Sequence, residues 1–216
     1  MKVLFIIPAR KGSKRLVGKN IKSFNGKPLV SHSIDFAKEV SSFEDSICVT
    51  TDDQEILEIA ARKQVDLIID RPSYLATESA TSLEVIEHAC GTALELNKDF
   101  DTIVLLQPTT PFRSKKDFAE MKKNFSSLNA AVYTSINYNI GDRKNLIYHE
   151  RNSMKKTQKN NGIEGFLNGS IYFFNYNSLR DIAELNTQNT YYYVMSKKHS
   201  IDIDTIEDWE YANSFL

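Results

Sequence analysis

Residues 3–20 read VLFIIPARKGSKRLVGKN. The apolar run at residues 3–7 predicts a short strand, and the basic residues after it share a loop with Gly12, Ser13 and Gly18. Eight Lys or Arg side chains lie in the first 34 residues and no carboxylate precedes Asp35, although the formal net charge of the chain is −1. Backbone N–H groups of such a loop approach phosphate oxygens, and its cations neutralise them. The stretch therefore predicts a strand leading into a polyanion-binding loop, with a nucleoside triphosphate as the expected ligand.

The loop does not have the spacing of a P-loop. A P-loop places four residues between its glycines and a Ser or Thr after its Lys, where the hydroxyl binds magnesium. Here five residues separate Gly12 from Gly18, and Asn20 follows Lys19. The alternatives are a solvated basic turn, which is what most charge runs are, and a nucleic-acid surface. The latter is disfavoured because such surfaces usually belong to basic domains.

Length and composition favour a single α/β domain spanning residues 1–216. Hydrophobic residues make up 41% and charged residues 25%, close to the globular norm, and no apolar stretch approaches the length of a bilayer span. The apolar start ends at Pro8, too early for a secretory signal. We therefore expect a cytoplasmic protein without a membrane partner. Cys48 and Cys90 are expected to be small buried hydrophobes, and the scattered histidines receive no role.

Short apolar runs alternate with helical patterns along the chain. Strands are expected at residues 3–7, 46–50, 65–69 and 103–106, with helices beginning near residues 28, 51 and 81, and further regular structure at 170–175, 178–185, 191–195 and from 206. This alternation predicts an open, mostly parallel sheet with helices on both faces. Ligands of such sheets bind at the carboxyl ends of the strands. The polar segments expected there are 10–20, 50–53, residue 71, 107–113 and 202–204.

Residues 136–168 have few apolar side chains in phase. Long irregular segments inside a compact domain are usually functional or lie at an interface. We therefore expect an inserted arm at 136–168.

Asp202-Ile203-Asp204 places two carboxylates on one face of an extended segment, with an inward apolar residue between them. Magnesium is usually held by one or two carboxylates together with substrate phosphates. The basic loop and this acidic pair would together form a triphosphate site. The alternative is that the two acids are solvated or cap the helix that begins after Thr205.

The chain resembles the cytidylyltransferases that make CMP-sialic acid and, more distantly, the CMP-Kdo synthetases. The matching segments are 7–10 through Lys19-Asn20, 26–29, 46–53, Arg71-Pro72, 80–82, 106–111 with Arg113, 168–172 and 200–205. The resemblance covers most of the chain. It implies the α/β nucleotidyltransferase fold.

The resemblance also implies roles for individual residues. The implied nucleotide ligands are Arg10, Ser13, Lys19, Asn20, Arg71 and Ser82. Arg10 and Lys19 would hold the triphosphate and act in catalysis with Asp202 and Asp204, which would bind Mg²⁺. Gln107 would help hold the acceptor sugar.

The implied reaction is attack by the anomeric hydroxyl of a 2-keto-3-deoxy nonulosonic acid on the α-phosphate of CTP, with release of pyrophosphate. Asp202 or coordination of the hydroxyl to magnesium would remove the proton. The stretch before Asn168 lacks the Arg-Pro that sialic acid synthetases usually carry there, so the acceptor stays open between N-acetylneuraminate and a modified relative such as legionaminic acid.

The family's dimers exchange an arm, and we expect a homodimer in which 136–168 reaches the neighbour's sugar site. Alternative functions are a CMP-Kdo-type enzyme, another sugar nucleotidyltransferase using UTP or GTP, and a catalytically silent CTP-binding paralogue.

Overall fold

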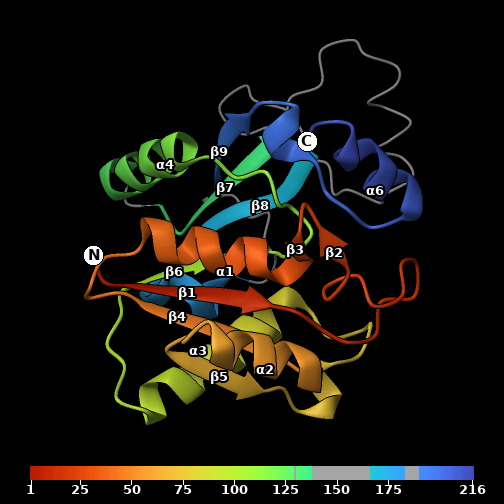
Figure 1. Cartoon of the computed structure of the whole chain (residues 1–216). Coiled ribbons are helices and arrows are strands. Elements are labelled where there is room, and N and C mark those ends of the chain that lie inside the picture. The colour runs from red at the N-terminus through yellow and green to blue at the C-terminus, as the bar shows by residue number, and fades with distance from the viewer. Residues whose placement is uncertain (129, 138–165, 183–189) are drawn as a thin grey trace.

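The structure is a computed structural model that describes residues 1–128, 130–137, 166–182 and 190–216 (Figure 1). Its main strands are β1 (Val3–Pro8), β4 (Ser46–Thr51), β5 (Leu67–Asp70), β6 (Thr102–Leu105), β7 (Val132–Asn137), β8 (Phe166–Asn175) and β9 (Thr190–Met195). They form one sheet in the order β5-β4-β1-β6-β8-β7-β9. β8 runs antiparallel to both of its neighbours, and the other pairings in this sheet are parallel. The expected mostly parallel sheet is confirmed.

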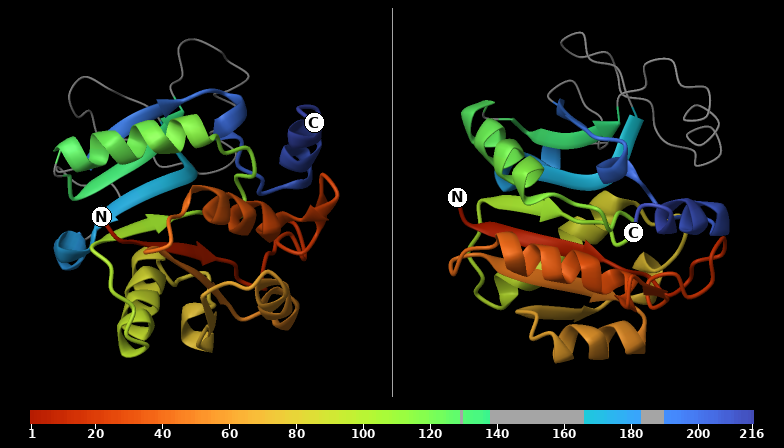
Figure 2. Two further views of the ribbon diagram at one scale, coloured as in Figure 1. Left: turned by 60° about the vertical axis from the view of Figure 1, so that its left-hand side comes forward. Right: turned by 45° about the horizontal axis from the view of Figure 1, so that its top comes forward.

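Helices cover both faces of the sheet (Figure 2). They are α1 (Leu29–Val40), α2 (Gln54–Arg62), α3 (Ser82–Glu95), α4 (Lys115–Leu128) and α6 (Ile206–Asn213), with short 3₁₀ helices η1 (Ser73–Leu75), η2 (Tyr176–Asp181) and η3 (Lys198–Ser200). One core contains apolar side chains of α1, α2 and α4, and the other contains those of α3 and η2. No helix in the described ranges is both long enough and apolar enough to cross a bilayer.

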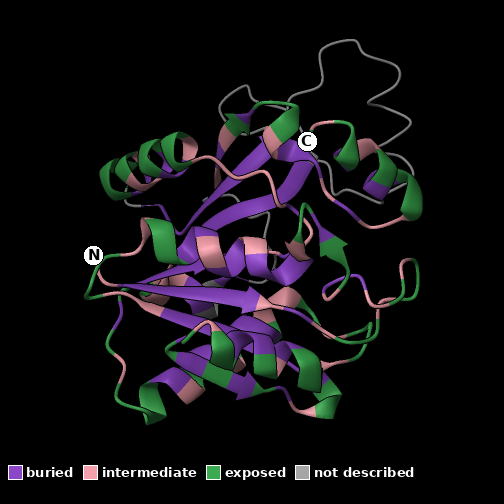
Figure 3. Cartoon of the chain, in the orientation of Figure 1, coloured by how far each residue is buried: buried purple, intermediate pink, exposed green. Residues whose placement is uncertain are grey.

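The central position of β1 in the sheet explains why its sequence is continuously apolar. Phe5 and Ile7 belong to the core under α1, whereas Leu4 and Ile6 belong to the core under α3, and all four are fully buried. A parallel strand covered on both faces needs apolar residues at successive positions. Figure 3 shows the same pattern across the sheet, with buried strands and exposed outer faces on the helices.

A third apolar cluster attaches the C-terminal helix to the rest of the fold. α6 packs beside the hairpin formed by β2 (Ser23–Phe24) and β3 (Lys27–Pro28) (Figure 1). The rings of Phe24 and Trp209 lie 5.3 Å apart, and Ile201 and Ile203 are buried in the same cluster. This packing brings the acidic segment 202–204 back toward the basic loop.

Four expectations differ from the structure. α4 was not predicted, because its buried anchors are limited to Phe118, Met121 and Phe125 among mostly charged neighbours. β5 begins two residues later than expected, after Gln64 turns the chain with a φ of 51°. The ends of the expected arm, 136–137 and 166–168, belong to strands β7 and β8, and its middle, 138–165, lies outside the described residues. Of the predicted 178–185, residues up to 181 are in η2.

Candidate active site

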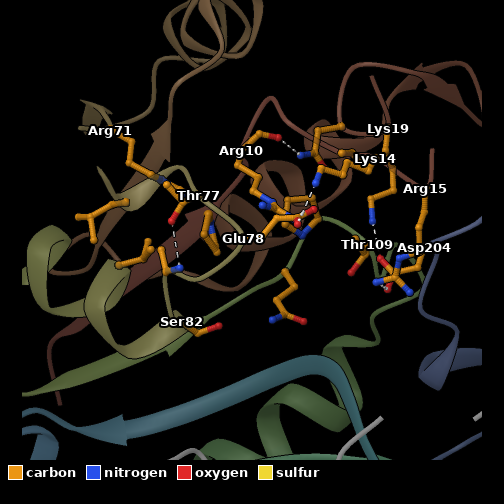
Figure 4. Close-up of a pocket in the computed structure, with 18 of the residues that line it drawn as sticks. Arg10, Lys14, Arg15, Lys19, Arg71, Thr77, Glu78, Ser82, Thr109 and Asp204 are labelled. Atoms are coloured by element: carbon orange, nitrogen blue, oxygen red, sulfur yellow. Dashed lines mark hydrogen bonds and ion pairs between the residues drawn. The ribbon is translucent and has the colours of Figure 1, made fainter. Parts of the chain in front are cut away.

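A pocket of about 400 Å³ lies at the carboxyl ends of the parallel strands (Figure 4). Pro8 ends β1, Arg71 follows β5, and Gln107 follows β6, and all three line it. The residues expected from the sequence all line this pocket: Arg10, Ser13, Lys19, Asn20, Arg71, Ser82, Gln107, Asp202 and Asp204. The structure thus brings together side chains from both ends of the chain, as the carboxyl-end rule for parallel sheets predicts.

The basic loop is shaped by its own backbone. The Ser13 N–H donates to Lys11 O at 2.9 Å, and the Lys11 N–H donates to Asp52 Oδ1 at 2.8 Å, which ties the loop to the end of β4. Gly18 adopts a φ of 64°, a left-handed conformation that glycine tolerates best. These contacts fix the path of the loop through protein groups alone.

The side chain of Asn20 connects the two ends of the basic loop. Its Nδ2 donates to Arg10 O at 3.0 Å, and the residue is only 8% exposed. Its buried Oδ1 has no hydrogen-bond partner among the described residues. A buried amide oxygen without a donor is costly, so this atom is available to a donor group of a ligand.

Asp204 is paired with two cations of the basic loop. Lys19 Nζ lies 2.6 Å from Asp204 Oδ1, and Arg15 Nη2 lies 2.9 Å from Asp204 Oδ2. Lys19 is buried, with 7% of its surface exposed. Burial of this cation beside a carboxylate strengthens the Coulombic attraction that an exposed pair would largely lose to water.

One carboxylate oxygen of Asp202, Oδ1, is buried. Burial, and then the neighbouring charge of Asp204, raise the pKa of Asp202 to about 6, while a hydrogen bond with Thr109 and the charge of Lys19 act in the opposite direction. The segment is held against the sheet by the Ile203 N–H, which donates to Thr109 O at 2.8 Å.

The capping interpretation of these acids is wrong. The N-cap of α6 is Thr205, which forms a capping box with Asp208, and both side-chain contacts of that box are present. Asp202 and Asp204 are therefore not the N-cap, and their carboxylates line the pocket instead.

The other end of the pocket holds Arg71 and Ser82 (Figure 4). Arg71 Nη2 donates to Thr50 O at 2.6 Å, and burial lowers the pKa of its guanidinium to about 10. Ser82 is the first residue of α3, whose N-cap Thr81 forms a capping box with Glu84. The helix therefore presents its positive N-terminal end next to the pocket.

The backbone carbonyl of Gln107 is held by the partly buried guanidinium of Arg113. Arg113 Nη2 donates to Gln107 O at 2.6 Å, and its Nε donates to Ser170 O at 2.8 Å. Burial lowers the pKa of the Arg113 guanidinium to about 9, while the charge of Asp202 acts against that shift. The loop after β6 is thus clamped between α1 and β8, because Arg113 Nη1 also donates to Ser33 Oγ at 2.9 Å.

Several pocket residues were not identified from the sequence. Lys14 Nζ and Glu78 Oε2 form an ion pair at 3.0 Å between the basic loop and the segment after η1, and the hydrogen bond from Lys14 lowers the pKa of Glu78. Arg15 and Thr109 contact the acidic residues. Lys14 and Arg15 lie in the loop that the sequence predicts to bind a polyanion, but no role was predicted for either one. No sequence pattern predicted that Glu78 lies in the pocket.

The comparisons with known proteins agree with this geometry. Residues 4–215 match the sequence model of a family described as Cytidylyltransferase. The N-acylneuraminate cytidylyltransferase of Escherichia coli O18:K1:H7 is 32% identical over 221 residues, which cover 98% of this chain and 51% of that protein. The CMP-N,N'-diacetyllegionaminic acid synthase of Legionella pneumophila is 30% identical over 225 residues, which cover 100% of this chain and 97% of that protein. The chain thus spans about half the length of the first relative and nearly all of the second.

A solved structure shows the same fold. The CMP:2-keto-3-deoxy-manno-octonic acid synthetase complexed with CTP superposes with a TM-score of 0.72 at 18% identity, covering 100% of this chain and 98% of that one. This likeness supports the nucleotidyltransferase type of fold. Because the family model spans nearly the whole chain and the pocket lies where such sheets bind ligands, the chain belongs to the cytidylyltransferase family.

Proposed function

We propose that this protein transfers CMP from CTP to the anomeric hydroxyl of a 2-keto-3-deoxy nonulosonic, sialic-type acid and releases pyrophosphate. The observation that carries the proposal is the meeting of the basic loop with the acidic segment, Lys19 Nζ to Asp204 Oδ1 at 2.6 Å, in the pocket that also contains Gln107. The family membership and the names of the two relatives support the same reaction.

In the proposed step the sugar oxygen forms a bond to the α-phosphorus, and the bond from that phosphorus to the β-phosphate oxygen breaks. Phosphoryl-type transfer is catalysed mainly by positioning and by electrostatic stabilisation. Arg10 and Lys19 would bind the triphosphate and stabilise the charge that builds on the leaving pyrophosphate. Ser13 and the loop amides would complete this cradle, while Asn20, Arg71 and Ser82 would hold the rest of the nucleotide.

The acidic pair fits a divalent cation. Asp202 and Asp204 line the pocket together, and burial followed by the charge of Asp204 raises the pKa of Asp202; a bound cation would relieve the repulsion between the two carboxylates. Two carboxylates completed by substrate phosphates are a donor set typical of magnesium. Mg²⁺ held there would supply positive charge at the reacting phosphate. The sugar hydroxyl must lose its proton in the same step, and Asp202, which lines the same pocket as Gln107, would accept it.

The acceptor and the assembly belong to the same proposal. Gln107 would contact the sugar acid, and the segment 138–165, outside the described residues, would reach the sugar site of the partner in a homodimer. We also propose a cytoplasmic location for the enzyme. A monodisperse monomer in light scattering would contradict the dimer.

The decisive experiment is pyrophosphate release with each of the four nucleoside triphosphates against a panel of acceptors. The panel contains N-acetylneuraminate, a legionaminic acid, Kdo and a sugar 1-phosphate, each with and without Mg²⁺. We expect release with CTP and a nonulosonic acid, and only with Mg²⁺ present. Activity with UTP and the sugar 1-phosphate instead would overturn the proposal, and binding of CTP without any release would favour a silent paralogue.

A further inference from the structure

The segment 168–172 resembles a family motif, yet the proposed reaction gives no task to its first residue, Asn168. This side chain is fully buried in β8, close to an irregularity where the register between β7 and β8 shifts. Its Oδ1 accepts from Ser135 Oγ at 2.6 Å and from the Ser170 N–H at 3.1 Å. Both lone pairs of the amide oxygen are thus occupied, which fixes the orientation of the amide plane.

The opposite atom of the same amide reaches the acidic segment. Asn168 Nδ2 donates to Ser200 Oγ at 3.0 Å, and Ser200 is itself only 2% exposed. Ser200 ends η3 and precedes Asp202 by two residues. The sheet is therefore connected through two buried side chains to the backbone that presents the carboxylates.

The neighbouring residue in β8 contacts the other half of the pocket. Gly169 has a φ of 70°, and a Cβ atom there would collide with Gln107 Oε1. Two successive residues of β8 therefore reach both sides of the pocket: Gly169 lies against Gln107, and Asn168 bonds to Ser200 of the segment that leads to Asp202. The position of Gln107 relative to the acidic pair depends on the backbone at these two residues.

We infer that Asn168, acting through Ser200, is a positioning residue that sets the place of Asp202 and Asp204 relative to Gln107. The inference rests on the proposed function for the identity of the groups being aligned. Neither side chain lines the pocket, so neither is a catalytic residue. Partners of this kind, one layer behind the ligating groups, orient carboxylates for metal binding, and their loss typically weakens metal affinity or activity by about 10- to 100-fold.

The test removes one hydroxyl. Ser200→Ala deletes the acceptor for Asn168 Nδ2, and Ser200→Thr keeps it as a rescue variant. Thr102→Val is the matched control, because it also removes a buried hydroxyl. That hydroxyl donates to Asp101 Oδ1 at 2.6 Å and lies at the start of β6, whereas Gln107 follows the other end of this strand. Fluorescence of Trp209, the single tryptophan, checks the fold because it packs in one cluster with Ile201 and Ile203.

Two readouts are measured below the melting temperature of every variant. Mn²⁺ binding in the presence of CTP, followed by electron paramagnetic resonance, needs no acceptor sugar, and steady-state kinetics give kcat and the KM for CTP. We expect Ser200→Ala to weaken Mn²⁺ binding by about tenfold or more and to lower kcat, with the KM for CTP unchanged. Ser200→Thr should restore both, and Thr102→Val should change neither.

Unchanged Mn²⁺ affinity in Ser200→Ala would overturn the inference. So would a parallel loss in Thr102→Val, since that result would indicate general destabilisation. The proposed function fails separately: if the wild-type protein releases no pyrophosphate with any acceptor, the Mn²⁺ measurement still decides whether Asn168 and Ser200 position the acidic pair.

Discussion

Lys19 and Asp204 are separated by 185 residues in the chain, and their side chains meet at 2.6 Å. Arg15, from the same loop as Lys19, holds the second oxygen of Asp204 at 2.9 Å. The acidic segment therefore neutralises part of the charge of the basic loop. A triphosphate with its divalent cation would provide both the anion for the loop and the cation for Asp204, so binding exchanges partners without leaving charges unpaired.

Replacing Asp204 and replacing Lys19 should affect different kinetic parameters. Asp204→Ala should abolish turnover, and Lys19→Ala should mainly raise the KM for CTP, with a loss in kcat/KM of at least roughly a hundredfold. Pyrophosphate release measures both. Lys116→Ala, at an exposed position on α4, is the charge-matched control for Lys19→Ala. Wild-type rates in both site variants would exclude this pocket as the active site.

Gly169→Ala should be harmful because of its place against Gln107. The left-handed backbone costs a side chain about 1–2 kcal/mol, and the added Cβ would collide with Gln107 Oε1. We expect a lower melting temperature and a raised KM for the acceptor sugar.

The same substitution at Gly91 provides the control. Gly91 lies inside α3 and an added Cβ there meets nothing within 4 Å. Gly91→Ala should therefore stabilise the protein by up to about 1 kcal/mol. Equal effects at the two glycines would contradict the role of close packing at Gly169.

Arg71→Met should separate ligand binding from stability. The guanidinium is buried, burial lowers its pKa, and its acceptor Thr50 O also receives the Ala9 N–H at 3.0 Å. Thr50 O keeps the Ala9 N–H as its donor, and an apolar side chain removes the cost of keeping a charge out of water. We expect the free energy of unfolding in urea to stay equal or rise, while CTP affinity falls by about tenfold, or 1.4 kcal/mol.

For this variant, Arg62→Met on the exposed side of α2, where Arg62 pairs with Glu58 at 3.6 Å, should change neither quantity. A large loss of stability in Arg71→Met with normal CTP binding would show that Arg71 is structural only.

Asp35 should make stability depend on acid pH. Burial raises its pKa, but hydrogen bonds from Lys27 and Lys63, each at 2.5 Å, outweigh it, so the pKa of Asp35 lies below its ordinary value. A lowered pKa in the folded state contributes stability that is fully present above the unfolded pKa of about 4 and is lost as pH falls through the folded value.

Asp35→Asn should therefore unfold more easily in urea at pH 6, and the difference from wild type should shrink as pH falls below about 4. Asp70→Asn, at a residue exposed at the end of β5, is the control with the same change of charge. A difference that stays constant with pH would contradict the ion-pair assignment.

Strands with apolar side chains on both faces could be predicted from the sequence, whereas strands that bury polar side chains could not. The apolar run of β1 marks a central strand because every position is buried. In contrast, β7 buries the polar residues Thr134, Ser135 and Asn137, of which Asn137 lies within the expected arm 136–168, and no strand was predicted there. Ser135 tolerates burial because it bonds Asn168 Oδ1 and the Ile171 backbone, contacts that exist only once β8 lies beside it.

The sequence by itself determined the kind of chemistry: a basic loop after the first strand, an Asp-x-Asp pair near the other end, and an alternation of strands and helices that places such segments at one edge of a sheet. These are local properties of residue type and spacing. Only the tertiary structure decided which groups meet, including Arg15 with Asp204, Lys14 with Glu78 and Asn168 with Ser200. Contacts between residues far apart in the chain follow from strand order and core packing, which bring distant segments together without leaving a periodic signal in either one.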